Sequence, residues 1–309
     1  MGIARAGARD FSLLGRHTMF KVLTRQWNKR RFLTMSLAAT SGMLSLPPDG
    51  DACEDSTRWA FLSDTHIHGN PQYRFRGFCT YQNLQRVADQ IGADMPEGLV
   101  ITGDLARSRG SADAYGNFKS LLAPIAKERP IHMCVGNHDH RDDFLLAFTG
   151  STDTAAIKDR HIVTAMAGPI RMIVLDTLLY VNTFPGMLGK LQRIWLETYL
   201  AASDETPTIL FFHHVPRADL LDTRRLFDII SPARKVKALV FGHSHRYEFS
   251  EREGIHLINL PATGYNFTAA QPVGWVEARL TGQGGEFKLH AVGGNVSQHG
   301  STRYVRWRR

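Results

Sequence analysis

Five apolar runs in this chain are each followed by one or more acidic, amide or imidazole side chains. The most crowded cluster follows residues 131–135, where a glycine is succeeded by Asn137, His138, Asp139 and His140. The other runs are residues 58–62, 98–101, 208–212 and 238–241, and they lead into Asp64, His66 and His68, into Asp104, into His213 and His214, and into His243 and His245. Eight of the fourteen histidines therefore lie just beyond predicted strands, which scattered core histidines would not do.

Strand and helix signals alternate along most of the chain. Apolar residues at helical spacing predict helices over about 81–91, 111–127, 142–148, 189–202 and 217–230. Besides the five apolar runs, strands are expected at 170–175 and, in shorter alternating form, at 254–260, 273–280 and 286–292. Such alternation predicts a layered α/β fold, in which polar groups just beyond the strand ends face one edge of a sheet. Segments far apart in the sequence should therefore meet at one site.

The charge of the chain is concentrated at its ends. The 309 residues carry a net charge of +8, yet residues 1–31 hold eight Lys or Arg against one Asp, and four arginines lie in residues 303–309. Residues 32–302 consequently carry about 3 more acidic than basic side chains. A folded part with this balance offers no strongly basic face, so no nucleic-acid partner is expected.

The amino end has the three parts of a secretory leader. Lys29, Arg30 and Arg31 precede an uncharged apolar stretch, residues 35–46, and a Pro-Pro-Asp-Gly turn follows. About twelve apolar positions are too few to span a bilayer, so no stable membrane span is expected. The basic part resembles a twin-arginine leader. We therefore expect residues 1–52 to be a basic arm with an export signal, and the mature protein to be periplasmic or extracellular. The alternative is a disordered basic arm on a cytoplasmic protein.

One folded domain is expected over residues 53–292, because α/β domains often reach about 200–250 residues. The remaining residues, 293–309, are polar and basic, and we expect them to form a poorly ordered tail. The three cysteines include no Cys-x-x-Cys pair, so they predict neither a zinc ribbon nor a disulfide framework.

The spacing of the polar groups suits metal binding. Asp64 and His66 are two residues apart, as are His243 and His245, so each pair can reach one ion from a bend at a strand end. The other candidates are the carboxylate of Asp104, the amide oxygen of Asn137 and the imidazole of His213. Oxygen and nitrogen ligands in this number fit two divalent cations such as manganese, iron or zinc. Two such ions about 3.5–4 Å apart can hold a bridging hydroxide and clamp a phosphoryl group, which is the chemistry of phosphate-ester hydrolysis.

Taken together, the motifs resemble those of the calcineurin-like metallophosphoesterase superfamily. In chain order they are Asp64-x-His66, Gly103-Asp104, Gly136-Asn137-His138-Asp139, His213 and Gly242-His243-x-His245. Each motif alone is weak, but the ordered set is specific, and the resemblance extends over about residues 59–292. It implies a four-layer α/β/β/α sandwich with two central mixed β-sheets flanked by helices. It also implies a dinuclear metal-dependent hydrolase of phosphate mono- or diesters.

The resemblance assigns roles to individual residues as well. One metal would be bound by Asp64, His66, Asp104 and His245, and the second by Asp104, Asn137, His213 and His243, with Asp104 bridging the two. His138 matches the histidine that assists departure of the leaving group, and Asp139 matches the carboxylate that orients it. A proton donor at that place relieves the negative charge that develops on the leaving oxygen.

The branch of the superfamily bears on the substrate. Purple acid phosphatases would have a tyrosine where this chain has Arg107. Residues 103–106 and 213–216 instead resemble the cyclic-nucleotide phosphodiesterase group, although Val215 stands where that group commonly has proline. A small-molecule phosphate ester is therefore the expected partner, and the candidate substrate contacts are His214, Tyr265 and Asn266.

Two alternatives stay open from the sequence. A phosphomonoesterase would use the same residues on a different ester. A non-catalytic metal-binding scaffold on the same fold should have lost ligands or the leaving-group histidine, whereas every motif position is filled here.

Overall fold

The computed structural model describes residues 55–149 and 157–309, which form two six-stranded β-sheets. In spatial order, the first sheet contains β14 (Thr302–Arg306), β13 (Gly284–Gly294), β12 (Pro272–Thr281), β1 (Ser56–Leu62), β4 (Gly98–Ile101) and β5 (Ile131–Met133). The second contains β10 (Glu248–Arg252), β11 (Ile255–Asn259), β9 (Val236–Phe241), β8 (Thr208–Phe211), β7 (Ile170–Val174) and β6 (Val163–Ala167). A separate hairpin pairs β2 (Arg74–Phe75) with β3 (Phe78–Cys79). The predicted export segment, residues 1–52, falls outside the described residues.

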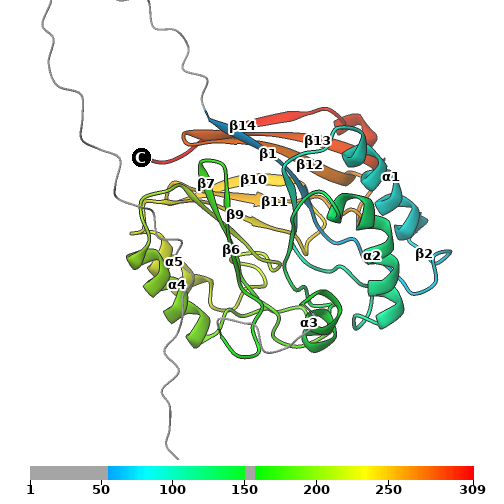
Figure 1. The fold of residues 1–309 in the computed structure, drawn as a ribbon, viewed down its shortest axis with the longest axis horizontal. Helices are drawn as coiled ribbons and strands as arrows, with labels where there is room; N and C mark the ends of the chain where they lie inside the picture. The colour runs from blue at the N-terminus through cyan, green and yellow to red at the C-terminus, as the bar shows by residue number, and fades with distance from the viewer. Residues whose placement is uncertain (1–54, 150–156) are drawn as a thin grey trace, which may run out of the picture. The chain divides into compact units, whose positions relative to one another are not determined.

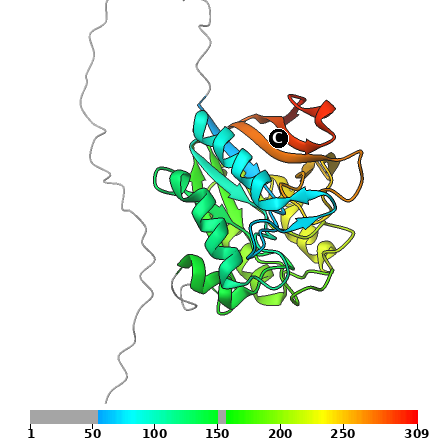
Figure 2. The ribbon, with the colours of Figure 1, turned by 90° about the vertical axis from the view of Figure 1, so that its right-hand side faces the viewer.

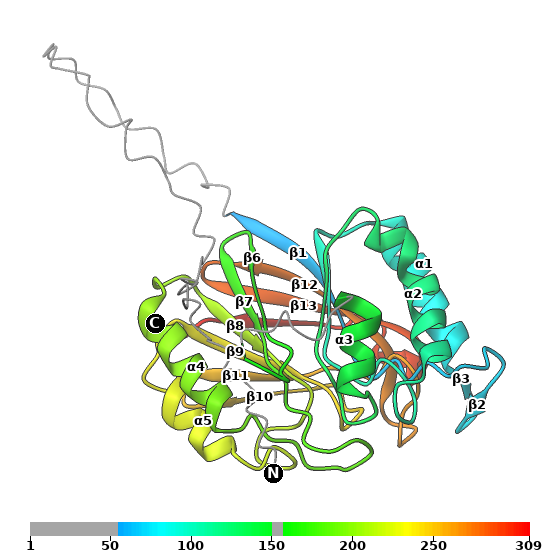
Figure 3. The same cartoon turned by 60° about the horizontal axis from the view of Figure 1, so that its bottom comes forward.

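Helices cover the outer faces of both sheets. The helices α1 (Thr80–Ala93), α2 (Ala112–Ala126) and α3 (Arg141–Thr149) share a buried apolar cluster with the first sheet. The helices α4 (Lys190–Ala202) and α5 (Thr223–Ile230) share another with the second sheet. The two groups of helices lie on opposite sides of the sheets (Figures 1 and 3), and Figure 2 looks onto α1 and α2, which lie side by side. This arrangement confirms the predicted four-layer sandwich.

The core between the two sheets explains the continuous apolar runs in the sequence. Trp59 and Phe61 of β1 belong to the cluster that both sheets share, whereas Ala60 and Leu62 pack with the helices of the first sheet. The strand β8 alternates in the same way between the shared core and the cluster around α4 and α5. Because a strand that is buried on both faces needs apolar residues at every position, the sequence shows runs rather than alternation.

Strand direction gathers the polar loops at one edge. The strands β1, β4 and β5 are parallel, and so are β7, β8, β9 and β11. The antiparallel strands β12, β6 and β10 lie beside these groups, which makes both sheets mixed, as predicted. The carboxyl ends of parallel neighbours come out at the same edge of a sheet, so the loops after β1, β4, β5, β8 and β9 are neighbours in space.

Helix boundaries agree with the sequence except in one place. Ser111 caps α2 as expected, because its Oγ accepts a hydrogen bond from the Ala114 N–H at 3.3 Å. The helix predicted over 217–230 begins only at Thr223, since the preceding segment forms a loop in which Pro216 bridges to Leu220. Within the described part of the chain, no helix is both long enough and apolar enough to cross a membrane.

The carboxyl-terminal segment, 293–309, was expected to be a poorly ordered tail, and that expectation is wrong. β13 runs on to Gly294, a short 3-10 helix (Val296–Gln298) follows, and β14 pairs with β13 as the edge strand of the first sheet. Trp307 is only 5% exposed and joins the core between the sheets, and its indole N–H donates to the Thr281 carbonyl at 2.9 Å. The Arg308 guanidinium donates to the Ile230 carbonyl at 2.8 Å, at the end of α5. One buried indole and one arginine therefore fix a segment whose average composition is polar.

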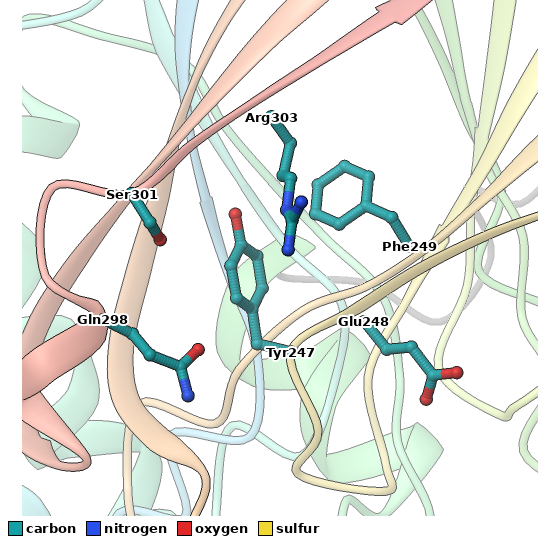
Figure 4. Close-up of a pocket in the computed structure, with 6 residues that line it drawn as sticks. All are labelled: Tyr247, Glu248, Phe249, Gln298, Ser301 and Arg303. Carbon is teal, nitrogen blue, oxygen red and sulfur yellow. The ribbon is translucent and has the colours of Figure 1, made fainter.

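A hollow of about 460 Å³ lies where the edge strands β10 and β14 of the two sheets approach each other (Figure 4). It is lined by Tyr247, Glu248, Phe249, Gln298, Ser301 and Arg303. Tyr247 and Arg303 point into it from opposite walls. These lining residues include none of the candidate metal ligands, so this hollow is separate from the site predicted from the sequence.

The position of Trp307 predicts a stabilising role for the carboxyl-terminal segment. Trp307→Ala should lower the free energy of unfolding by about 3–5 kcal/mol, because it empties a large buried volume in the core between the sheets. Urea unfolding curves would measure the loss. Tyr304→Ala on the same strand is the matched control, because Tyr304 is 76% exposed and its removal should change the stability by less than about 0.5 kcal/mol. Equal unfolding midpoints for the two variants would contradict the assignment.

Candidate metal centre

All seven candidate ligands lie in loops that follow strand ends. Asp64 and His66 come after β1, Asp104 after β4, Asn137 after β5, His213 after β8, and His243 and His245 after β9. Six of them are buried and His243 is half-buried. The loops of both sheets meet here, since the His243 N–H donates to Asp64 Oδ2 at 3.0 Å. The predicted convergence of these residues is therefore observed.

A first group consists of Asp64, His66 and His245, whose potential ligand atoms lie within 4.8 Å of one another. The Nε2 atoms of the two imidazoles are 3.1 Å apart. Asp64 Oδ1 lies 3.3 Å from His245 Nε2 and 3.8 Å from His66 Nε2. Two ring nitrogens and one carboxylate oxygen thus face a common point.

A second group consists of Asp104, His213 and His243, joined by Asn137. His213 Nε2 lies 3.4 Å from Asp104 Oδ1, 3.2 Å from Asn137 Oδ1 and 3.2 Å from His243 Nδ1. The amide oxygen that the sequence suggested as a ligand is therefore directed at the same point as the two imidazoles.

The carboxylate of Asp104 connects the two groups. Its Oδ1 faces His213 of the second group, while its Oδ2 lies 3.7 Å from His66 Nε2 of the first group. The His138 N–H donates to Oδ1 at 2.8 Å, which fixes the orientation of the carboxylate. This is the geometry of a bridging ligand.

The ring nitrogens of His213 and His245 that face away from the centre have hydrogen-bond acceptors, and that of His243 lies near a carboxylate. His213 Nδ1 is 2.8 Å from the Thr102 carbonyl oxygen, and His245 Nδ1 is 2.6 Å from the Tyr265 carbonyl oxygen. A carbonyl oxygen only accepts, so Nδ1 of both rings carries a hydrogen and Nε2 faces the centre, where it can bind an ion when it carries no hydrogen. His243 Nε2 lies 3.7 Å from Asp219 Oδ2. Asp219 is not recognisable from the sequence, because it falls in the part of the 217–230 segment that is loop rather than helix.

The centre has an excess of electron-pair donors, which is a test of whether metal ions fit. Asp64 Oδ1 is buried without a hydrogen-bond donor, and it faces imidazole lone pairs. Buried acceptors that face one another repel unless positive charge lies between them. Carboxylate, amide and imidazole donors together suit divalent transition metals, so the residues present fit a pair of such ions.

The pKa values of the imidazoles reflect both their burial and the carboxylates beside them. Burial lowers the pKa of His66 to about 3 and, together with the charge on His213, that of His243 to about 4. Burial acts in the same direction on His213, but the carboxylates of Asp104 and Asp64 outweigh it and raise the pKa of His213 to about 9. A proton on His213 thus neutralises part of the negative charge of the Asp104 and Asp64 carboxylates in the metal-free protein.

Backbone conformation at this edge is strained. Five of the candidate ligands have a left-handed backbone, namely Asp64 at φ 50°, His66 at 46°, Asp104 at 51°, His243 at 68° and His245 at 54°. Such conformations are uncommon for residues other than glycine and cost on the order of 1 kcal/mol each. The turns also need glycine at two positions. A Cβ atom on Gly136 would collide with the Asp104 carboxylate, and one on Gly242 would collide with the Asp64 carboxylate. The sharp turns direct successive polar side chains inward.

The structure corrects the role that the family resemblance assigned to Asp139. Its carboxylate accepts hydrogen bonds from the backbone N–H groups of Gly136 at 2.9 Å, Leu105 at 3.2 Å and Ala106 at 3.1 Å. Its remaining partner is the Tyr115 hydroxyl at 3.1 Å. Asp139 therefore ties the loop after β5 to the loop after β4 rather than orienting His138.

The three candidate substrate contacts are buried side chains. His214 Nδ1 lies 2.8 Å from the Thr177 hydroxyl, and the Asn266 amide donates to the Gln271 carbonyl at 2.6 Å. The Tyr265 ring packs against the rings of His66 and His245, with centroid distances of 4.8 and 4.7 Å. All three support neighbouring residues, and contact with substrate stays a prediction.

Comparison with known proteins agrees with the geometry. The family model described as calcineurin-like phosphoesterase matches residues 57–247, a range that contains all seven candidate ligands. A 3′,5′-cyclic adenosine monophosphate phosphodiesterase, CpdA of Pseudomonas aeruginosa, is 29% identical over 218 residues, covering 67% of this chain and 76% of that protein. A probable cyclic nucleotide phosphodiesterase of Rhodococcus erythropolis is 29% identical over 236 residues, covering 72% of this chain and 76% of that protein. The resemblance to this group is confirmed.

Solved structures support the fold. A dimetal phosphatase from Danio rerio superposes with a TM-score of 0.63 at 14% sequence identity, over 82% of this chain and 100% of that one. Since the family model spans more than half of the chain and every ligand position of the motif set is filled and brought together, the protein belongs to the calcineurin-like phosphoesterase family.

Proposed function

We propose that this metal-dependent phosphoesterase hydrolyses a small phosphodiester, with a cyclic nucleotide as its substrate. The observation that carries the proposal is the position of Asp104, whose two oxygens face two separate groups of nitrogen and oxygen donors. A bridging carboxylate between two cation positions is what in-line displacement at phosphorus requires.

The seven residues would hold two divalent ions, manganese, iron or zinc. Asp64, His66 and His245 serve the first, Asn137, His213 and His243 the second, and Asp104 serves both. When bound, the ions supply Lewis-acid stabilisation of the phosphoryl oxygens and an activated water. The hydrogen bonds to the Thr102 and Tyr265 carbonyls orient the His213 and His245 rings in the metal-free protein, with Nε2 directed at the centre.

His138 is the proton donor to the leaving group in this proposal. Its ring is half-buried beside the two groups, and one of its nitrogens lies within 4.8 Å of donor atoms of His66 and Asp104. A proton on the ring would pass to the leaving oxygen as the P–O bond breaks, so that the leaving group departs neutral. The backbone N–H of the same residue holds Asp104, which fixes donor and bridge relative to each other.

The relatives named cyclic nucleotide phosphodiesterases support the choice of substrate class. The test is a side-by-side assay of metal-reconstituted protein on an aryl phosphate monoester, an aryl diester and a cyclic nucleotide. We expect the highest kcat/KM with the cyclic nucleotide. A preference for the monoester would instead favour a phosphomonoesterase, and turnover of none of the three would favour a scaffold.

Asp104→Asn should remove most activity while leaving the fold intact, because the bridging charge is lost. We expect kcat/KM to fall by at least about 100-fold, since even the outer partners of metal ligands typically contribute about 10–100-fold. The same esters would be assayed with metal content verified. Asp89→Asn, which makes the same chemical change on the exposed face of α1, should retain full activity. Turnover close to that of the unmodified protein in Asp104→Asn would contradict the bridging role.

Metal binding should release a proton from His213. With a pKa of about 9 in the metal-free protein, this ring is protonated at neutral pH, whereas a ligand must be neutral. Binding should therefore release about one proton at pH 7, and the apparent affinity should rise with pH until about pH 9. Calorimetry in two buffers with different heats of ionisation measures the release. His213→Gln should abolish it, and unchanged proton release in that variant would exclude His213 as its source.

His138→Ala should slow esters with poor leaving groups more than activated ones. A general acid typically contributes about 100-fold or more, and a nitrophenyl leaving group needs little of that help. Rates on an alkyl ester and a nitrophenyl ester would be compared, with metal content as the control. Equal losses on both esters, or loss of bound metal, would show that His138 acts as a ligand or structural group instead.

A further inference from the structure

The loop after β7 brings a polar side chain onto the proposed proton donor. Asn182 Oδ1 lies 2.8 Å from His138 Nδ1, although the two residues are 44 positions apart in the sequence. The Asn182 backbone N–H donates to the Asn137 carbonyl at 2.7 Å, so the loop is also tied to the turn that carries a metal ligand. Two independent hydrogen bonds thus place this loop against residues 137–138.

The carboxylate next to His138 in the sequence is occupied elsewhere. Both oxygens of Asp139 accept hydrogen bonds, from three backbone N–H groups and from the Tyr115 hydroxyl. The contact that the ring of His138 makes through Nδ1 is with the amide of Asn182. The orienting group of the proton donor is therefore to be sought in the loop after β7.

We propose that Asn182 is the positioning residue for His138. Its Oδ1 accepts the Nδ1–H hydrogen, which fixes the plane of the ring and leaves Nε2 for the leaving-group oxygen. This inference rests on the proposed function, in which the Nε2 proton passes to that oxygen. The electron pair of the broken P–O bond stays on the oxygen, and the ring remains bonded to Asn182 through Nδ1–H.

The backbone of Asn182 suits this task. Its φ is 56°, in the left-handed region, where asparagine is one of the few tolerated residues other than glycine. The residue is exposed, so its side chain is not needed to fill the core. A neutral amide also orients the ring without adding another negative charge beside Asp104, which already lies between two groups of ligands.

The test removes the side chain without straining the turn. Asn182→Gly keeps the left-handed backbone and the N–H bond to Asn137. We expect kcat on an alkyl phosphodiester to fall by about 10–100-fold, with the nitrophenyl diester much less affected and with KM and metal content unchanged. Asn182→Asp, which retains an acceptor oxygen, should restore most of the lost rate. Thr183→Ala, the neighbouring change in the same loop, is the control and should leave both rates unchanged.

A double-mutant cycle with His138→Ala decides whether Asn182 acts through the imidazole. If it does, Asn182→Gly should cost nothing further once the ring is absent. The inference would be overturned by additive losses in the cycle, by equal losses on both esters in Asn182→Gly, or by failure of Asn182→Asp to restore the rate. If the unmodified protein hydrolyses the esters and Asn182→Gly matches it on both, only the positioning role falls. If the unmodified protein with two bound metals hydrolyses no phosphate ester, the proposed function falls and this inference falls with it.

Discussion

The buried carboxylates of Asp64 and Asp104 are the constraint on which the rest of the site depends. Each has one oxygen held by a backbone N–H, from His243 and from His138 respectively. The other oxygen, Asp64 Oδ1 or Asp104 Oδ2, faces imidazole nitrogens. An unpaired buried charge is costly, and apart from a proton on His213 the two negative groups are surrounded by further electron-pair donors. Positive charge at two points would balance these donors, which is the physical reason that the residues fit two cations.

The position of these charges follows from the sheets, and their convergence follows from strained turns. Parallel strands direct their carboxyl ends to one edge, but a loop in ordinary conformation would send alternate side chains away from it. Left-handed residues at Asp64, Asp104 and His243 reverse the chain within one or two positions. Gly136 and Gly242 let the backbone approach the carboxylates more closely than any side chain would allow. The strain stored in these turns is retained because ligand placement depends on it.

Sequence alone predicted what depends on local pattern. The buried strands, the layers and the convergence of the seven candidate ligands follow from apolar runs, parallel strand ends and the motif set. The capping of α2 by Ser111 follows from the side chain itself. What sequence missed depends on a few contacts in otherwise polar segments. Trp307 fixes a carboxyl-terminal strand that average composition assigned to a tail, and Asp219 reaches His243 from a loop whose apolar spacing resembled a helix.

Asp139 and Asn182 show why a sequence motif specifies residue types but not the directions in which their side chains point. In the turn after β5, the Asp139 N–H donates to the Gly136 carbonyl at 3.2 Å, while the Asp139 carboxylate accepts from the Gly136 N–H. This closed turn folds the carboxylate back under the chain, toward the loop after β4. A side chain directed there cannot also reach the ring of the residue before it. The partner of His138, the proposed proton donor, comes instead from the loop after β7, which is bonded to the same turn.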